Sequence, residues 1–151
     1  TQFNLPLEFK VVVPSALNVG LPIDVLTPDI ESNASARFDT EGTRADLVES
    51  ATLTEMTLEL VSPEGEDFSF LEQLEVYISA DGVGEELMAS SGQVPANAGT
   101  TLSLSCTDLD LKAYILAETF DVRIRTVTDE LTTQDVEVDV GCVFRINAEL
   151  L

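Results

Sequence analysis

The last eighteen residues of the chain alternate between apolar and polar side chains. The apolar residues occupy every second position: Val136, Val138, Val140, Cys142, Phe144, Ile146, Ala148 and Leu150. Because successive side chains of a β-strand point to opposite faces, this spacing predicts a strand with one buried and one wet face. The first residues follow the same period, with Phe3, Leu5, Leu7, Phe9, Val11 and Val13 as the apolar set. Both ends of the chain are therefore expected to be long strands.

Short β-prone segments succeed one another between these two ends, separated by residues typical of turns. They cover residues 21–26, 34–39, 51–61, 74–80, 86–89, 102–106 and 120–125. No alternation of strands with helices is visible, so the pattern predicts an all-β fold, an antiparallel β-sandwich with Greek-key connections and about seven to nine strands. Since no linker or repeat divides the chain, residues 1–151 are assigned to a single β-sandwich domain.

Three local features refine this expectation. The apolar phase of residues 51–61 changes near Thr54, which predicts a β-bulge there, because one extra residue reverses the facing of all later residues in the strand. Leu111, Tyr114 and Ile115 have helical spacing, which predicts one short helical turn near residues 108–116. Pro22 places the segment 21–26 at a sheet edge or in an extended loop.

The length of the C-terminal alternation is a separate constraint. Eighteen extended residues span nearly 60 Å at about 3.3 Å each, whereas a compact domain of this size is about 38 Å across. The last strand is therefore expected to bend at Gly141, to cross between the sheets, or to project beyond the body.

The charge of the chain restricts its partners. Asp and Glu number 28 against 7 Lys and Arg, which gives a net charge of −21 with no histidine. Nucleic acid binding and attraction to an anionic membrane both need clustered basic residues, so neither is expected. No apolar run is long enough to insert into a membrane. The chain begins at Thr1 rather than Met, which is typical of a processed, exported protein, so we expect an extracellular or cell-surface location.

Catalytic machinery is not expected. Without histidine, the commonest general base and all Ser-His and Cys-His arrangements are missing. Pairs of carboxylates would still permit glycoside hydrolysis on residue types alone. However, the chain has no tryptophan and only two tyrosines, Tyr77 and Tyr114, so a sugar-stacking cleft would be poorly supplied.

Acidic side chains gather in three places where they could bind calcium, although none has the spacing of a known calcium loop. These clusters are Glu64, Glu66 and Asp67; Asp81, Glu85 and Glu86; and Asp108 and Asp110. Solvated turns, and helix capping by Asp108 or Asp110, explain the same residues without an ion. No cofactor other than calcium is expected. The outward arginines Arg123, Arg125 and Arg145 are expected to pair with acidic neighbours on one sheet face.

Cys106 and Cys142 both fall at inward positions of expected strands. In an exported protein they would form a disulfide worth about 2–4 kcal/mol, because a crosslink constrains the unfolded chain. The alternative is two small buried residues that never meet.

Several turn-and-strand motifs resemble those of small exported β-rich proteins of Bacteroidota-type bacteria. They are residues 62–71 (SPEGEDFSFL), 75–82 (EVYISADG), 27–30 (TPDI) and 126–131 (TVTDEL). The resemblance implies export and a β fold. This group has no assigned activity and includes lipid-anchored forms, but the first residue here is not a cysteine.

Two functions fit these expectations. The first is a non-catalytic exported structural protein that associates with copies of itself, the strand Phe3, Leu5, Leu7, Phe9, Val11 and Val13 of one subunit completing the sheet of the next to form a filament. The second is a monomeric extracellular binding or adhesion module for a glycan or protein, with end loops as the binding surface and a possible dependence on calcium. An ordinary monomer whose end strands stay within their own sheet is the plain alternative to both.

Overall fold

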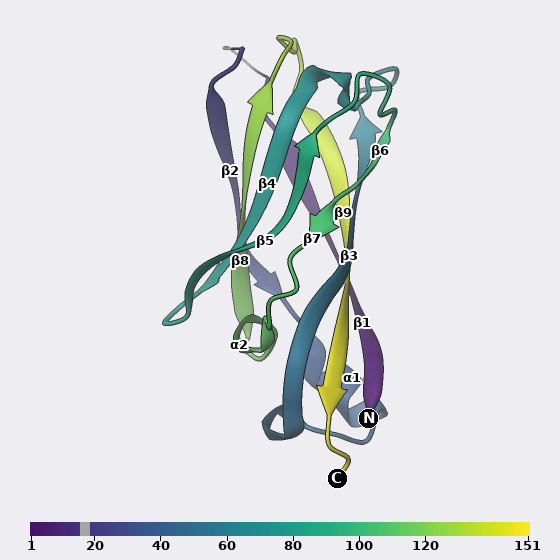
Figure 1. Cartoon of the computed structure of the whole chain (residues 1–151), viewed down its shortest axis with the longest axis vertical. Coiled ribbons are helices and arrows are strands. Elements are labelled where there is room, and N and C mark those ends of the chain that lie inside the picture. Colours follow the sequence, from purple (N-terminus) through teal and green to yellow (C-terminus); the bar gives the residue numbers. More distant parts are fainter. Residues whose placement is uncertain (16–18) are drawn as a thin grey trace.

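Two antiparallel sheets stack on each other in this protein, as shown by a computed structural model that describes residues 1–15 and 19–151 (Figure 1). Sheet A has the strand order β1-β9-β3-β6, and sheet B has the order β2-β8-β4-β5-β7. The strands are β1 (Gln2–Val13), β2 (Pro22–Glu31), β3 (Val48–Ser62), β4 (Leu71–Ala80), β5 (Gly84–Gln93), β6 (Thr101–Ser103), β7 (Ser105–Cys106), β8 (Thr119–Thr128) and β9 (Val136–Ala148). The predicted antiparallel β-sandwich is confirmed.

Most connections pass from one sheet to the other. Among the described elements, only β4 and β5 are consecutive in the chain and also neighbours in a sheet. The steps from β1 to β2, β2 to β3, β3 to β4, β5 to β6 and β8 to β9 all change sheet. Each sheet is therefore assembled from segments that lie far apart in the sequence, and the buried apolar side chains between the sheets form one cluster.

Strand β9 is the centre of sheet A. It pairs with β1 in an unbroken register from Gln2–Asn147 to Val13–Val136, and on its other side it pairs with β3. Every second side chain of β9 enters the core, and from Val136 to Ala148 these side chains are no more than 3% exposed. The period of two in the sequence thus identified both the strand and its buried face.

The length of β9 differs from the expectation. The strand has 13 residues and spans about 43 Å at 3.3 Å per residue. It stays in one sheet, because the body itself is elongated along the strands (Figure 1). The last residues turn aside at the end: Glu149 N–H donates to the Leu47 carbonyl and Leu151 N–H to the Gly42 carbonyl, both at 3.0 Å. Leu150 is 64% exposed, so the buried alternation ends at Ala148. Because β9 pairs within sheet A along its whole length, the expected crossing between the sheets is wrong.

Strand β3 contains the predicted bulge. Its register against β9 shifts between Leu53 and Glu55, and the hydroxyl of the extra residue, Thr54, donates to the Val143 carbonyl at 3.0 Å. The shift keeps Leu53 and Met56 both in the core. Strand β2 is an edge strand, as Pro22 predicted, although it extends to Glu31.

The helical elements are short. They are α1 (Ala34–Thr40), α2 (Lys112–Ile115) and two 3-10 turns, η1 (Ala45–Leu47) and η2 (Phe68–Phe70). Helix α2 confirms the predicted turn, and Leu111, Tyr114 and Ile115 are buried there. The prediction of a strand at 34–39 is wrong. Ala34, Ala36 and Phe38 alternate as in a strand, but only Ala34 and Phe38 are buried, which is the i, i+4 spacing of a helix. None of the described helices is long and apolar enough to span a membrane.

The central position of β9 predicts a clear difference between its two faces. Replacing the fully buried Ile146 (Ile146→Ala) is expected to lower the free energy of unfolding by about 2–5 kcal/mol, through lost transfer energy and the cavity left behind. Glu137, an exposed residue on the other face of the same strand, is the matched control. Glu137→Ala should change the free energy of unfolding by less than about 0.5 kcal/mol. Urea unfolding at neutral pH measures both; equal effects would contradict the assignment of faces.

Candidate functional site

Strand β1 is the first edge of sheet A, and no described strand pairs with its outer side. Phe3, Leu5, Leu7, Val11 and Val13 are buried at 9% exposure or less, while Phe9 is half-buried against the same core. All the predicted assembly residues therefore line one strand face, as the sequence indicated. In this structure that face fills the strand's own sandwich.

Helix α1 anchors the N-terminal end of β1. The ring of Phe3 meets that of Phe38 edge-on, with centroids 6.2 Å apart and planes at 73°. The Arg37 guanidinium lies 5.9 Å from the Phe3 ring centroid and pairs with Glu41 at 3.2 Å. Sequence reasoning missed these contacts because it took residues 34–39 as a strand; the i, i+4 charge pair of Arg37 and Glu41 was the available signal.

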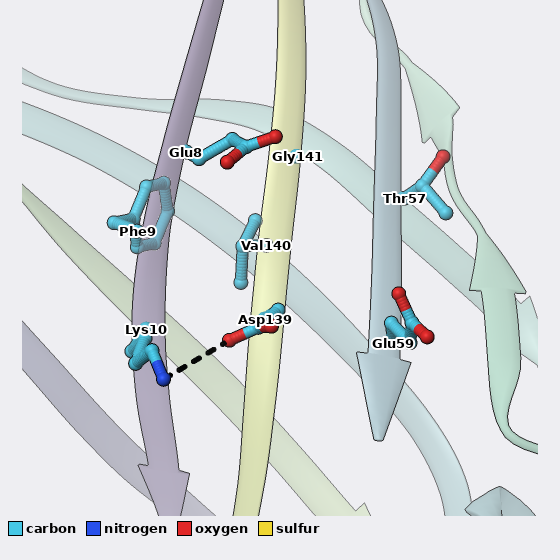
Figure 2. A pocket seen from close by; sticks show the side chains of 8 residues that line it. All are labelled: Glu8, Phe9, Lys10, Thr57, Glu59, Asp139, Val140 and Gly141. Carbon is cyan, nitrogen blue, oxygen red and sulfur yellow. Dashed lines mark ion pairs between the residues drawn. The ribbon is translucent and has the colours of Figure 1, made fainter. Parts of the chain in front are cut away.

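A hollow lies on the outer face of sheet A beside this edge (Figure 2). It arises at Gly141, which has no side chain and sits in register between Glu8 of β1 and Thr57 of β3. Lys10 borders it and pairs with Asp139 of β9 at 3.8 Å, as Figure 2 shows. This pair is largely exposed, so its net contribution to stability is small.

The outer face of sheet B carries a hydrogen-bonded polar group centred on Arg123 of β8. Its Nε and Nη2 donate to the two carboxylate oxygens of Glu85 at 3.1 and 2.8 Å, and Nη1 donates to Asp24 Oδ1 at 2.8 Å. The guanidinium carbon lies 4.2 Å from the Tyr77 ring centroid, and the Tyr77 hydroxyl donates to Glu75 at 3.2 Å. The bidentate bond from Arg123 lowers the pKa of Glu85, and burial is the first cause that raises the pKa of Tyr77.

These contacts confirm cross-strand pairing for Arg123 and correct the expectation that three arginines share a face. Arg123 and Arg125 lie on β8 in sheet B, whereas Arg145 lies on β9 in sheet A. Period-two spacing shows only that each side chain points outward, and not from which sheet. Sequence reasoning also missed Tyr77, which the register places beside Arg123.

Both cysteines remain thiols, so the predicted disulfide between Cys106 and Cys142 is absent. The two residues lie in different sheets, Cys106 on β7 of sheet B and Cys142 on β9 of sheet A. The prediction that both cysteine side chains face inward was correct. The sequence did not show in which sheet each of their strands would lie.

One residue in each of the acidic clusters proposed for calcium has a structural partner. Asp67 accepts the Ser69 N–H at 2.9 Å and caps η2, which lowers its pKa. Asp110 accepts N–H groups from Ala51 and Lys112, both at 3.0 Å, and Glu85 is held by Arg123. Within residues 1–15 and 19–151, no group of three or more acidic or cysteine side chains is placed to hold a metal ion. Of the two predicted capping residues, Asp110 accepts the Lys112 N–H at the start of the short helix.

A second hollow lies at the α1–α2 end of the sandwich, where end loops could form a binding surface. Its lining includes Asn33, Phe38, Ile115, Leu116 and Glu118. The single aromatic residue in that lining, Phe38, is 2% exposed and is engaged with Phe3. No aromatic surface is therefore presented to a sugar ring in this hollow.

Arg123 is expected to make the stability of the fold depend on pH. Because Arg123 lowers the pKa of Glu85, the pair stabilises the fold above the ordinary pKa of glutamate, and this contribution is lost as pH falls through the lowered pKa. Arg123→Ala is expected to raise the pKa of Glu85 in an NMR titration and to lower stability by about 1 kcal/mol at neutral pH, but less under acidic conditions. Arg125→Ala, an exposed change on the same strand, should do neither; equal effects from both variants would contradict the arrangement.

The two thiols should differ in reactivity. Burial raises the pKa of Cys142 to about 12, whereas Cys106 is half-buried and its pKa is raised by burial and by Asp108 and Glu55. Since the thiolate is the reactive form, a thiol reagent at pH 8 should modify native protein at Cys106 and reach Cys142 only after unfolding. Cys106→Ser should abolish the native reaction and Cys142→Ala should leave it unchanged. Rapid labelling of native Cys142 would contradict this assignment.

Comparison with known proteins does not assign the chain to a family. No family model matches the chain, and no curated protein matches it. Solved structures with similar folds include the crystal structure of FLHE, at 8% identity and TM-score 0.40 over 98% of each chain. A CBM32 module from Clostridium perfringens, solved with GalNAc-β-1,3-galactose, has 13% identity and TM-score 0.36 over 79% of this chain and 94% of that one. The Triatoma virus empty capsid has 8% identity and TM-score 0.41 over 99% of this chain and 90% of that chain.

Proposed function

We propose that this chain is a non-catalytic structural protein, acting outside the cell or at its surface, that associates with copies of itself by exchanging β1. The observation that supports this most directly is the position of β1. It is an edge strand whose apolar side chains complete the core, and it adjoins the rest of sheet A only through β9. It can therefore leave without separating any other pair of strands.

Exchange preserves the contacts of the strand. A β1 from a second copy would meet the same β9 partners and the same aromatic anchor at Phe38, so the final states differ mainly in association entropy. The barrier is high, since each buried Leu, Val or Phe contributes about 1.5–3 kcal/mol that is lost while the strand is free. Slow assembly that accelerates under mildly destabilising conditions is the expected behaviour.

The non-catalytic part of the proposal has separate support. Three acidic side chains from the clusters that could bind an ion have structural partners: Glu85 holds Arg123, Asp110 bonds two backbone N–H groups, and Asp67 caps a turn. Cys142 is buried and its raised pKa makes it a poor nucleophile.

A disulfide staple between β1 and β9 tests the exchange. Thr1 shares both of its backbone hydrogen bonds with Ala148, so the odd residues of β1 bond to β9 and the even ones form the closer, non-hydrogen-bonded pairs. Lys10 and Asp139 are such a pair on the outer face, with Cα atoms expected about 4.5 Å apart, which suits a disulfide. The double variant Lys10→Cys, Asp139→Cys can therefore close within one chain, or between two chains if β1 has been exchanged.

The expected result is a ladder of crosslinked subunits when assembled protein is oxidised, visible on a non-reducing gel. Protein oxidised as a dilute monomer should close on itself and then fail to assemble until it is reduced. Lys10→Cys with Glu59→Cys is the control, because Glu59 lies one strand beyond Asp139 and cannot reach residue 10. A closed monomer that assembles as readily as the unmodified chain, or crosslinks found within single chains only, would overturn the exchange.

A further inference from the structure

The edges of the two sheets are unequally protected. Strand β2 carries Pro22 and Pro28, and its register breaks between Thr27 and Ile30, where Asp29 has a positive φ of 57°. At the opposite side, β6 and β7 have three and two residues. Prolines, bulges and short length are the devices that keep an edge from pairing with another chain. Strand β1 has 12 residues and no register shift, with Pro6 as its one interruption.

The outer edge of β1 is formed by its even residues. Because the odd residues bond to β9, the backbone N–H and carbonyl groups of Asn4, Glu8, Lys10 and Val12 point away from the sheet, where no described strand pairs with them. Pro6 also points outward, so its missing N–H costs no bond to β9. The stretch from residue 7 to residue 13 is therefore an open ladder without a proline.

The side chains along this stretch are arranged symmetrically about Phe9. Glu8 and Lys10 flank it on the outer face, and the Lys10 side chain is 77% exposed. Phe9 itself points to the core side but is only half-buried, whereas Val11 and Leu7 on either side are buried at 2% and 9%. The strand thus presents a negative and a positive charge with an incompletely covered aromatic ring between them.

We propose that the outer edge of β1 is a two-fold interface, where it pairs antiparallel with β1 of a second copy so that Phe9 of each lies on the symmetry axis. In this register, Glu8 of one copy lies opposite Lys10 of the other, and symmetry makes the pair twice. Each such pair exchanges two backbone hydrogen bonds. The two Phe9 rings form the close, non-hydrogen-bonded pair at the centre, which covers the exposed part of both.

Charge selects this register over its neighbours. A shift of one residue in either strand would turn core-facing residues outward, so only even shifts keep both sheets aligned. The nearest permitted shifts place Glu8 opposite Glu8 or Lys10 opposite Lys10, and like charges directly opposite are destabilising. The permitted shifts after those place Glu8 opposite Pro6 or Pro14, and a backbone hydrogen bond of the ladder is lost there because proline has no N–H. The proposed register pairs the unlike charges and keeps Glu8 and Lys10 away from proline. Its two outer pairs place Val12 opposite Pro6, and each lacks the bond that an N–H at position 6 would donate.

This interface is independent of strand exchange. The outer edge is the same whether β1 comes from its own chain or from another copy, so it would make closed dimers of monomers or join exchanged assemblies side by side. Each copy carries a net charge of −21, and the resulting repulsion must be screened for the edges to meet. Measurements should therefore be made at physiological salt or above.

Complementary charge reversals test the register. Glu8→Lys places lysines opposite each other in the pair, and Lys10→Glu places glutamates opposite each other, so each variant alone is expected to dimerise at least about tenfold more weakly than the unmodified chain. Mixing the two variants restores both unlike pairs, and heterodimers should form with near-original affinity. Sedimentation and native mass spectrometry distinguish these species. Dimerisation unaffected by either reversal, or no recovery on mixing, would overturn the proposal.

A crosslink at the axis gives a second readout. Phe9→Cys brings two cysteines into the close pair at the centre, so mild oxidation should yield a covalent dimer that dithiothreitol reverses. Gln2→Cys is the control, because in this register the two residues at position 2 lie about 46 Å apart. Equal crosslinking of both variants, or none with Phe9→Cys, would contradict the two-fold arrangement. If oxidation of assembled protein closed the Lys10–Asp139 staple within single chains only, strand exchange would be refuted and this interface would still stand.

Discussion

The structure depends on the burial of one strand from two sides. Strand β9 forms hydrogen bonds with β1 on one side and β3 on the other, and its alternate side chains lie in the core along the whole strand. This arrangement satisfies both of its backbone edges and buries its apolar face, so the segments that pair with it are held in register by hydrogen bonds and packing together. The bulge at Thr54 in β3 and the unbroken ladder of β1 are two ways of matching the same central strand.

The acidity of the chain is distributed so that carboxylates contribute to the fold at defined points. Asp67 and Asp110 accept backbone N–H groups that secondary structure leaves unpaired, and Glu85 and Asp24 hold Arg123 over the ring of Tyr77. Hydrogen bonds to charged groups are stronger than neutral ones, so these few carboxylates contribute more to the fold than a carboxylate that contacts only solvent. The surplus of negative charge opposes contact between copies and makes any association depend on salt.

The edge strands of the two sheets determine where a β-sandwich of this kind can pair with a strand of another chain. Sheet B ends in a strand with two prolines and a bulge, while sheet A ends in a long regular strand with an apolar inner face and an unlike charge pair on its outer one. This contrast is the basis for proposing that copies associate through β1. Exchange of that strand and addition of a second strand beside it use different surfaces of β1, its β9-facing side and its open side.

Period-two spacing by itself determined the β class, the buried faces of β1 and β9, the outward direction of the arginines and the phase change at Thr54, because a strand exposes alternate residues to different environments. Helical spacing likewise revealed α2. The tertiary structure decided what depends on strand order: that Cys106 and Cys142 lie in different sheets, that Arg145 belongs to a different sheet from Arg123, and that β1 is an edge. It also decided that residues 34–40 form a helix, since Phe38 is buried against Phe3, about thirty-five positions away in the chain. Local spacing carries no information about which distant segments become neighbours, and those neighbours define the surfaces available for function.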